Sequence, residues 1–230
     1  MRQYVANSAY FGVVISLVGY EIGLFVKRKL KKSFINPLLI AIILVMCALI
    51  AMGIDFEAYN NSARYLSWLL TPATVCLAVP LYEQLSLLRR HFRAVMTGIA
   101  SGVLTSLCSI LLLSKLFGLS HSLYVTLLPK SITTAIGMGI SEELGGVPSI
   151  TMASIFITGI FGNVVAELVL KLFRITHPIA KGVSLGTACH AIGTAKALEL
   201  GQIEGAMSSL AIAVAGLMTV VLASVFAQFM

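Results

Sequence analysis

Charged residues are scarce in this sequence of 230 residues, and acidic residues are the scarcest of them. Only 11% of the residues are charged, with nine Asp and Glu against sixteen Lys and Arg, whereas soluble domains contain about 25%. Hydrophobic residues account for 58% of the chain, and its mean hydropathy is +0.97. This composition excludes a soluble globular domain and predicts an integral membrane protein.

The sequence also lacks the short motifs of common catalytic and metal sites. It contains no phosphate-binding GxxxxGK[ST] loop, no GxSxG or HExxH motif and no CxxC pair, so the chain is not expected to hydrolyse ATP itself. We therefore expect no enzyme activity, no catalytic residues, no cofactor and no metal site. All four cysteines fall in apolar segments, and we interpret them as small buried apolar residues. They are Cys47, Cys76, Cys108 and Cys189.

Positive charge is concentrated in three short clusters that separate apolar segments. Residues 27–32, 89–93 and 171–181 together hold eleven of the sixteen Lys and Arg residues. Basic residues flank membrane segments on the cytoplasmic side, so the net charge of +7 indicates topology rather than nucleic-acid binding. The apolar stretch 7–26 precedes the first cluster and is too long for a signal peptide. We expect it to be a retained first span with the N-terminus outside the cytoplasm.

Apolar stretches of two kinds alternate along the chain. Five are long enough to cross a bilayer, which needs about 20 residues: 7–26, 36–54, 94–117, 148–170 and 205–229. Three others contain prolines or glycines that interrupt a helix: 66–81, 123–140 and 182–198. Non-helical backbone at membrane depth is stable only where protein covers it or water fills a cavity. The pattern predicts an all-α polytopic membrane protein of about 7–8 segments with its functional site at the interrupted ones.

The segment 123–140 decides the orientation of the second half of the chain. If it re-enters the membrane as a hairpin, the basic cluster 171–181 lies in the cytoplasm, as the distribution of basic residues favours. If it crosses once, that cluster lies outside. We prefer the re-entrant arrangement.

Under that arrangement the chain reads as two inverted repeats within a single transmembrane domain, 1–230. The first span and basic loop occupy 1–35, repeat 1 occupies 36–117, the interrupted segment occupies 118–147 and repeat 2 occupies 148–230. Pro37 and Pro148 open the two repeats. Inverted repeats with paired interrupted helices are typical of secondary transporters, whose substrate site lies near the midplane. The competing interpretation is that membrane helices rich in small residues resemble one another by composition.

The stretch LLPKSITTAIG places an ammonium group within one interrupted segment. Lys130 follows a proline and precedes Ser131, Thr133 and Thr134. A charge at mid-bilayer costs about 2.5–3.5 kcal/mol on insertion scales. A lysine, hydroxyl groups and the free N–H groups of a broken helix together favour an anion such as a carboxylate. The alternative is a lysine whose ammonium group reaches the membrane interface.

The other two interrupted segments, paired with each other, supply further candidate ligands of the substrate. They are Thr71 and Thr74 in the first segment and Thr187, His190 and Thr194 in the second. His190 is also a candidate proton carrier, because histidine titrates near neutral pH, or it is an interhelical hydrogen-bonding residue.

Two side chains of the span 148–170 are candidates for proton coupling. Asn163 and Glu167 lie four residues apart and therefore on one helical face. Glu167 either carries a coupling proton or forms a structural ion pair with Lys130 or Lys196. Lys196 lies close enough to the end of its segment to reach the interface as well. The spacing of Gly98 and Gly102 is typical of close helix packing or a subunit contact, which makes a homo-oligomer plausible.

Three stretches resemble the LrgB/CidB family of bacterial inner-membrane proteins. They are LTPATVCLAVPLYEQ, LLPKSITTAIGMGISEELGG and GTACHAIGTAKALELGQIEGAMSSLA. The resemblance covers nearly the whole chain, and the C-terminal half of the plastid glycolate/glycerate transporter of plants is similar. It implies a multi-pass protein of the bacterial inner (cytoplasmic) membrane that works with a small LrgA/CidA-like membrane partner. It supplies no residue roles, so the assignments above rest on the residues themselves.

The resemblance implies two functions. One is secondary transport of small monocarboxylates of the pyruvate, glycolate or glycerate type. The other is a holin/antiholin-like role that modulates murein hydrolase activity and cell lysis. A pore-forming protein needs no charge at the midplane, whereas a transporter needs interrupted helices and polar groups at depth. The residues favour the transporter. We expect the chain to interact with the carboxylate and the lipid bilayer and not to bind nucleic acid.

Overall fold

The computed structural model describes residues 8, 10–30, 36–69, 72, 75–76 and 78–230, and every regular element within them is a helix. This confirms the all-α class. The chain divides into two compact units, Met1–Cys76 and Leu77–Met230. The division falls inside the segment 36–117 that the sequence suggests as repeat 1, so the internal repeat stays a prediction.

In the part of the first unit that the structure describes, three helices have defined bounds. They are α2 (Phe11–Leu30), α3 (Pro37–Met52) and α4 (Phe56–Trp68). Helix α3 begins at Pro37 because the side chain of Asn36 accepts hydrogen bonds from the backbone N–H groups of Leu38 and Leu39, at 2.8 and 3.4 Å. It ends at Gly53, whose φ of 61° and ψ of 41° are the left-handed conformation that glycine adopts without strain.

Glycines on one face of α2 allow the other two helices to approach closely. The backbone N–H of Gly12 donates to Oγ of Ser62 on α4 at 2.9 Å. A methyl group at Gly23 would overlap the backbone of Pro37 on α3. The small residues of α2 therefore set the packing distance within the first unit.

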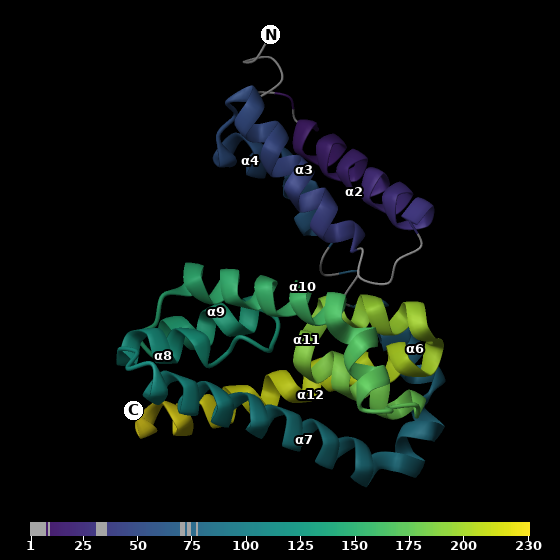
Figure 1. Cartoon of the computed structure of the whole chain (residues 1–230), viewed down its shortest axis with the longest axis vertical. Helices are drawn as coiled ribbons and strands as arrows, with labels where there is room; N and C mark the ends of the chain where they lie inside the picture. Colours follow the sequence, from purple (N-terminus) through teal and green to yellow (C-terminus); the bar gives the residue numbers. More distant parts are fainter. Residues whose placement is uncertain (1–7, 9, 31–35, 70–71, 73–74, 77) are drawn as a thin grey trace. The chain divides into compact units, whose positions relative to one another are not determined.

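The second unit contains the remaining helices (Figure 1). They are α6 (Ala78–Glu83), α7 (Leu85–Leu116), α8 (His121–Leu127), α9 (Thr134–Glu143), α10 (Pro148–Leu172), α11 (Pro178–Leu200) and α12 (Gln202–Phe226), followed by a 3₁₀ turn at Ala227–Phe229. Helix α11 packs along α12 because Gly182 and Gly186 lie against the backbone of Glu204 and Ser208. Helix α7 contacts both of them.

One face of α7 supplies the largest part of the hydrophobic core. Its buried residues lie three, four or seven positions apart, which is one stripe of an α-helix. They are Leu88, Val95, Ile99, Val103, Leu107 and Ile110. They pack in one cluster with Met207, Ala211 and Ala215 of α12. This stripe is buried in the core. The small and hydroxyl-bearing residues of α7 lie on an adjacent face of the helix.

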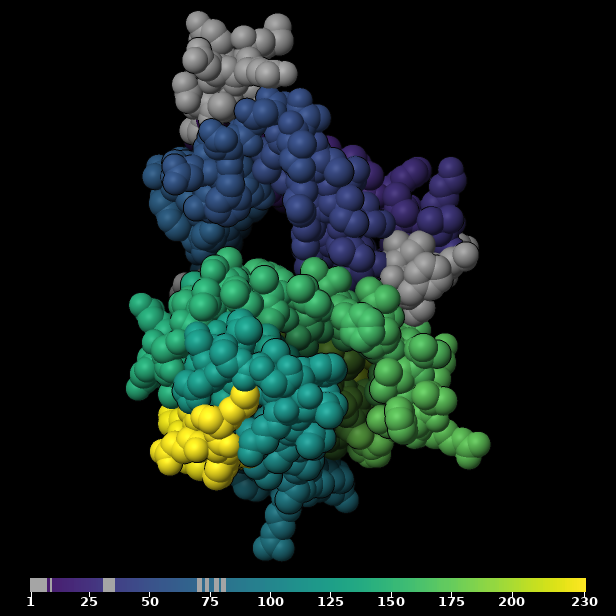
Figure 2. Space-filling view, turned by 60° about the vertical axis from the view of Figure 1, so that its left-hand side comes forward, coloured from purple at the N-terminus to yellow at the C-terminus, as the bar shows by residue number. Residues whose placement is uncertain are grey.

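Contacts at the C-terminal end of the chain fix α8 in place. The hydroxyl of Tyr124 donates to the carbonyl of Phe226 at 2.7 Å, and Nδ1 of His121 lies 2.7 Å from the carbonyl oxygen of Met230. Figure 2 shows these last residues, in yellow, against the teal helices of the same unit. The turn that follows α8 is thereby held at a defined position.

The spans expected from the sequence agree with the helices in part. Within the described residues, three helical segments are long and apolar enough to cross a membrane, namely Leu85–Leu116, Pro148–Leu172 and Gln202–Phe229. Helix α3 is apolar but has only 16 residues. Helix α2 has 20 residues but carries Glu21 and three basic residues in its last turn. The expected count of 7–8 segments is therefore not confirmed.

The structure confirms interruptions in two of the three expected segments. Helix α8 ends at Leu127 and α9 begins at Thr134, with non-helical residues between them. Helix α11 is broken at His190, which has a φ of 43° and a ψ of −132°. The third segment, 66–81, contains residues outside the described part of the chain, and the two candidate ligands Thr71 and Thr74 are among them.

The interpretation of the cysteines needs correction. Cys189 is buried, but Cys47, Cys76 and Cys108 are exposed. An apolar segment of a membrane protein has outward-facing positions that suit lipid, so its small apolar residues need not face the protein interior.

Candidate functional site

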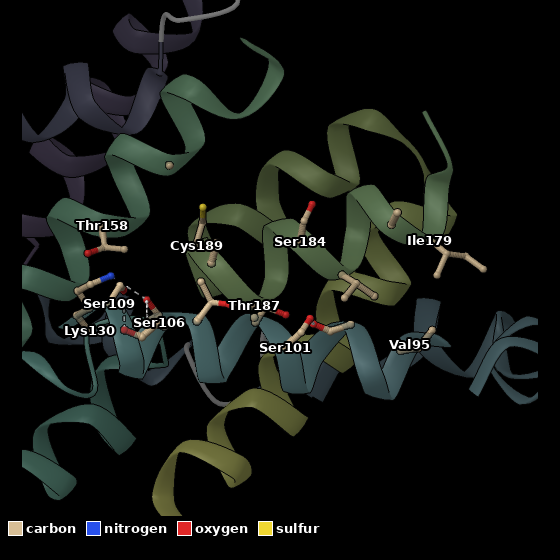
Figure 3. Close-up of a pocket in the computed structure, with 18 of the residues that line it drawn as sticks. Val95, Ser101, Ser106, Ser109, Lys130, Thr158, Ile179, Ser184, Thr187 and Cys189 are labelled. Atoms are coloured by element: carbon tan, nitrogen blue, oxygen red, sulfur yellow. Dashed lines mark hydrogen bonds between the residues drawn. The ribbon is translucent and has the colours of Figure 1, made fainter. Parts of the chain in front are cut away.

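A cleft of about 1010 Å³ opens in the second unit between α7, α10 and α11 (Figure 3). The turn between α8 and α9 contributes Lys130 and Ser131 to one end of it. The lining contains no carboxylate group among the residues that the structure describes. The interrupted segment 123–140 thus contributes Lys130 to the cleft. The broken helix α11 contributes residues that precede its break at His190.

Small and hydroxyl-bearing residues of α7 form one wall of the cleft. They are spaced three or four positions apart, which places them on one helical face. They are Gly98, Ser101, Gly102, Thr105, Ser106 and Ser109. A methyl group at Gly102 would lie 2.7 Å from Cγ2 of Thr187, so this glycine also sets the close approach of α7 and α11, as the packing interpretation of the sequence expects.

Lys130 is half-buried and directs its ammonium group into the cleft. Its Nζ donates to Oγ of Ser131 at 3.3 Å, and Oγ of Ser106 donates to the same oxygen at 3.2 Å. Neither bond uses the hydroxyl hydrogen of Ser131, which stays available to a ligand. No carboxylate lies within 4.0 Å of Nζ in the described part of the chain. The ammonium group therefore has hydroxyl neighbours and no negative charge to balance it.

Thr187 presents a second unsatisfied group at the same place. Its side chain is 7% exposed, and its Oγ1 finds no hydrogen-bond partner among the described residues. A buried hydroxyl without a partner costs about 1–3 kcal/mol. Thr187 lines the cleft and also a neighbouring cavity of about 10 Å³, which Ser106, Ser131 and Thr219 line as well. That cavity has room for about one water molecule, so the region accepts a polar ligand or water.

His190 does not line the cleft. Its ring is buried, and Nε2 lies 3.1 Å from the carbonyl oxygen of Ile155, to which it donates. Gly159 makes room for the ring, because a methyl group there would lie 2.8 Å from Cε1 of His190. This geometry matches the interpretation of His190 as an interhelical hydrogen-bonding residue, because its ring connects the break in α11 to the backbone of α10.

Three predicted threonine ligands also lie away from the cleft lining. The hydroxyl of Thr194 donates to the carbonyl of His190 at 3.1 Å and lies 2.7 Å from Oγ of Ser208. Thr133 is the residue before α9, and Thr134 is its first residue. Of the predicted ligands that the structure describes, it brings Lys130, Ser131 and Thr187 to the cleft.

Glu167 forms an ion pair, as one of the two alternatives for this residue predicts. Its Oε1 lies 2.7 Å from Nζ of Lys196, which also donates to Glu199 at 3.3 Å. Nδ2 of Asn163 donates to the carbonyl of Ile192 at 3.0 Å. These contacts tie α10 to the part of α11 beyond the break, and none of the side chains involved lines the cleft.

Sequence reasoning missed the hydroxyl-bearing lining residues of α7 and further lining residues of α10 and α11, such as Thr158 and Ser184. The hydroxyl positions were readable from the helical spacing that starts at Gly98. Cys189, His91 and His177 also line the cleft. No local pattern marks these three, because packing of α7 against α11 brings them together.

The cleft combines a positively charged, hydrogen-bonding end with apolar walls. A cation and hydroxyl donors lie at one end, and apolar side chains such as Ile157, Phe161 and Val183 contribute to the walls. This combination suits a small organic anion with an apolar or hydroxylated body.

Comparison with known proteins finds one family whose members match nearly the whole chain. The model of the LrgB-like family matches residues 16–229. Proteins named antiholin-like protein LrgB from Bacillus cereus (strains B4264 and AH187) and Bacillus anthracis (strain A0248) are similar to the chain. Each is 38% identical over 221 residues, which cover 96% of this chain and 96% of the relative. No solved structure matches.

Proposed function

The chain belongs to the LrgB-like family, and from this premise we propose that it is a membrane protein whose cleft binds small carboxylate anions and transports them. The observation that carries the proposal is the half-buried Lys130, which lines the cleft beside Ser131 and has no carboxylate within 4.0 Å among the described residues. A bound carboxylate supplies the missing negative charge.

The hydrogen-bond donors beside Lys130 suit two carboxylate oxygens. One oxygen accepts from the ammonium group, and the hydrogen of the Ser131 hydroxyl is available to the other. The unpartnered hydroxyl of Thr187 is at hand for a hydroxyl or keto group of the substrate. Pyruvate, glycolate and glycerate each combine a carboxylate with such a group.

The two helix breaks supply the means of movement that transport requires. The turn between α8 and α9 carries Lys130, and the break at His190 divides α11. The part of α11 beyond the break is tied to α10 by the Glu167–Lys196 ion pair. We infer that this part and α10 move as one body against α7, which opens the cleft to each side of the membrane in turn.

The names of the relatives favour a second candidate, an antiholin-like role, over transport. Under this candidate the chain modulates murein hydrolase activity and cell lysis, and it acts through a membrane assembly rather than through a substrate. Both candidates place the chain in the bacterial inner membrane with its N-terminus outside the cytoplasm. Both include a small LrgA/CidA-like partner and self-association.

Uptake into proteoliposomes separates the candidates. We expect saturable uptake of labelled pyruvate or glycolate by vesicles that hold the chain, stimulated by an imposed pH gradient and abolished by Lys130→Ala. Lys115→Ala is the matched control, because Lys115 is exposed at the end of α7 and does not line the cleft.

A dye-leak assay on the same vesicles, with and without the LrgA/CidA-like partner, tests the second candidate. Leak of an uncharged dye that depends on the partner, together with absent uptake in both preparations, would favour the antiholin-like role and contradict transport.

A further inference from the structure

Two histidines lie in the cleft at the end remote from Lys130. His91 comes from α7 and His177 immediately precedes α11, and both line the cleft. Their ring centroids are 6.3 Å apart with an interplanar angle of 65°. Figure 3 shows Lys130 and Val95 toward opposite ends of the lining, and Val95 is one helical turn from His91. The lining of α7 extends from His91 to Ser109, a length of about 27 Å at about 1.5 Å per residue.

The local backbone at each histidine departs from a regular helix. His91 has a φ of −110° and a ψ of 16°, which bends α7 at this residue. His177 is extended, with a φ of −69° and a ψ of 126°, as expected for a residue before a proline. Its side chain makes no capping bond to α11. The sequence thus places both imidazoles at helix irregularities.

The four histidines of the chain fall into two classes. Nε2 of His190 donates to the carbonyl of Ile155, and Nδ1 of His121 lies at hydrogen-bond distance from the carbonyl oxygen of Met230. The ring nitrogens of His91 and His177 have no hydrogen-bond partner in the part of the chain that the structure describes. Only the two cleft histidines therefore have both ring nitrogens available to a ligand.

The charges around this pair favour an anion. All charged residues within four positions of either histidine are basic: Arg89, Arg90, Arg93, Arg174 and Lys181. On the neighbouring helices the acidic residues are Glu83, at the end of α6, and Glu204, whose carboxylate lies beside Gly201 at the start of α12. Glu167 of α10 and Glu199 of α11 pair with Lys196. A concave surface with an excess of positive charge concentrates anions and raises their rate of association.

From these contacts we propose that His91 and His177 form a second anion-binding station, at which the carboxylate docks at the mouth of the cleft before it reaches Lys130. This inference rests on the proposed binding of carboxylates by the cleft. The imidazole N–H groups of His91 and His177 donate to the anion, and the hydroxyl face of α7 lines the route between the two stations. The ligand of this station is a small monocarboxylate on its way to Lys130. The station serves as the entrance to the cleft, and the principal site is at Lys130.

Nuclear magnetic resonance of the full chain, labelled with ¹⁵N-histidine in nanodiscs, tests the station directly. The chain has four histidines, and His→Gln variants assign their signals. Titration with glycolate should shift the signals of His91 and His177, also in a Lys130→Gln background, and leave His121 unchanged. Glycolamide, the uncharged analogue, should shift neither. The absence of glycolate-dependent shifts at the pair, or equal shifts at His121, would overturn the proposal.

Uptake kinetics give a second and independent readout. The double variant His91→Gln/His177→Gln should raise the KM for glycolate about fivefold with Vmax kept, which is the scale of a lost exposed charge contact. His121→Gln is the control and should leave KM unchanged. If the wild-type chain takes up no carboxylate, the transport function fails, and the resonance titration alone decides whether the station exists.

Discussion

Oε1 of Glu167 on α10 lies 2.7 Å from Nζ of Lys196 on α11, so the protein itself neutralises this buried lysine. Lys130 lies in the turn between α8 and α9, where its Nζ donates to the Ser131 hydroxyl and has no carboxylate within 4.0 Å among the described residues. The two lysines come from similar stretches of small and hydroxyl residues. Their different partners assign them different roles, because Lys196 joins two helices and Lys130 remains available to an anion.

The ion pair should matter for stability. Glu167→Gln leaves the Lys196 ammonium, which is 7% exposed, with the half-exposed Glu199 as its one carboxylate partner among the described residues. We expect a loss of about 1–3 kcal/mol, because a buried charge loses its shortest partner. Thermal unfolding in detergent measures it. Glu143→Gln is the control, since that residue is exposed, and equal melting temperatures of the two variants would contradict the role assigned to the pair.

Two threonines of α11 should respond oppositely to the same substitution. Thr194→Val removes a hydroxyl that bonds to His190 and Ser208, so it should lower the free energy of unfolding by about 1 kcal/mol. Thr187→Val removes a hydroxyl without a partner among the described residues, so it should leave stability unchanged or raise it. It should still weaken glycolate binding. Denaturant titration distinguishes the variants, and equal destabilisation would contradict the assignment of Thr187 as unsatisfied.

The space around His190 can be tested with a matched pair of glycines. Gly159→Ala places a methyl group 2.8 Å from both the His190 ring and Ile192, and overpacking of this kind costs about 1–3 kcal/mol. Gly139→Ala lies in α9 with nothing within 4 Å, and it should stabilise that helix by up to about 1 kcal/mol. Melting temperatures that move in the same direction would show that α10 and α11 do not pack as described.

The hydroxyl face of α7 should contribute to binding through Ser131. Ser106→Ala removes the donor that, at 3.2 Å, holds the Ser131 hydroxyl beside Lys130. We expect a two- to tenfold loss of glycolate affinity, the scale of one hydrogen bond of about 0.5–1.5 kcal/mol. Ser149→Ala, at an exposed position of α10 outside the cleft, serves as the control. Unchanged glycolate affinity in the Ser106 variant would contradict a role of the Ser131 hydroxyl in binding.

Local composition was sufficient to predict the helix breaks and the lysine at one of them. Pro129 and the hydroxyl residues that follow it mark the turn between α8 and α9, and the glycines around His190 mark the break in α11. The helical spacing of the hydroxyl face of α7 was also readable, but the same spacing is typical of helix packing. At Gly102 the structure shows that both interpretations apply.

The remaining features depend on contacts between segments distant in the sequence. The partner of His190 is the carbonyl of Ile155, and the partner of Lys196 is Glu167, so both assignments require the docking of α10 on α11. The expected number of membrane segments is not confirmed, because among the described helices α2 carries four charged residues and α3 has only 16 residues.

Equilibrium binding of labelled glycolate to the purified chain tests the central claim most directly. Wild type, Lys130→Gln and Lys115→Gln are compared at one pH and ionic strength. We predict saturable binding to the wild type and to the Lys115 variant, with at least a tenfold weaker affinity for Lys130→Gln, because a charge-assisted bond is worth about 1.5–3 kcal/mol. Equal binding by all three proteins, or no binding to the wild type, would contradict the claim that Lys130 holds a carboxylate in the cleft.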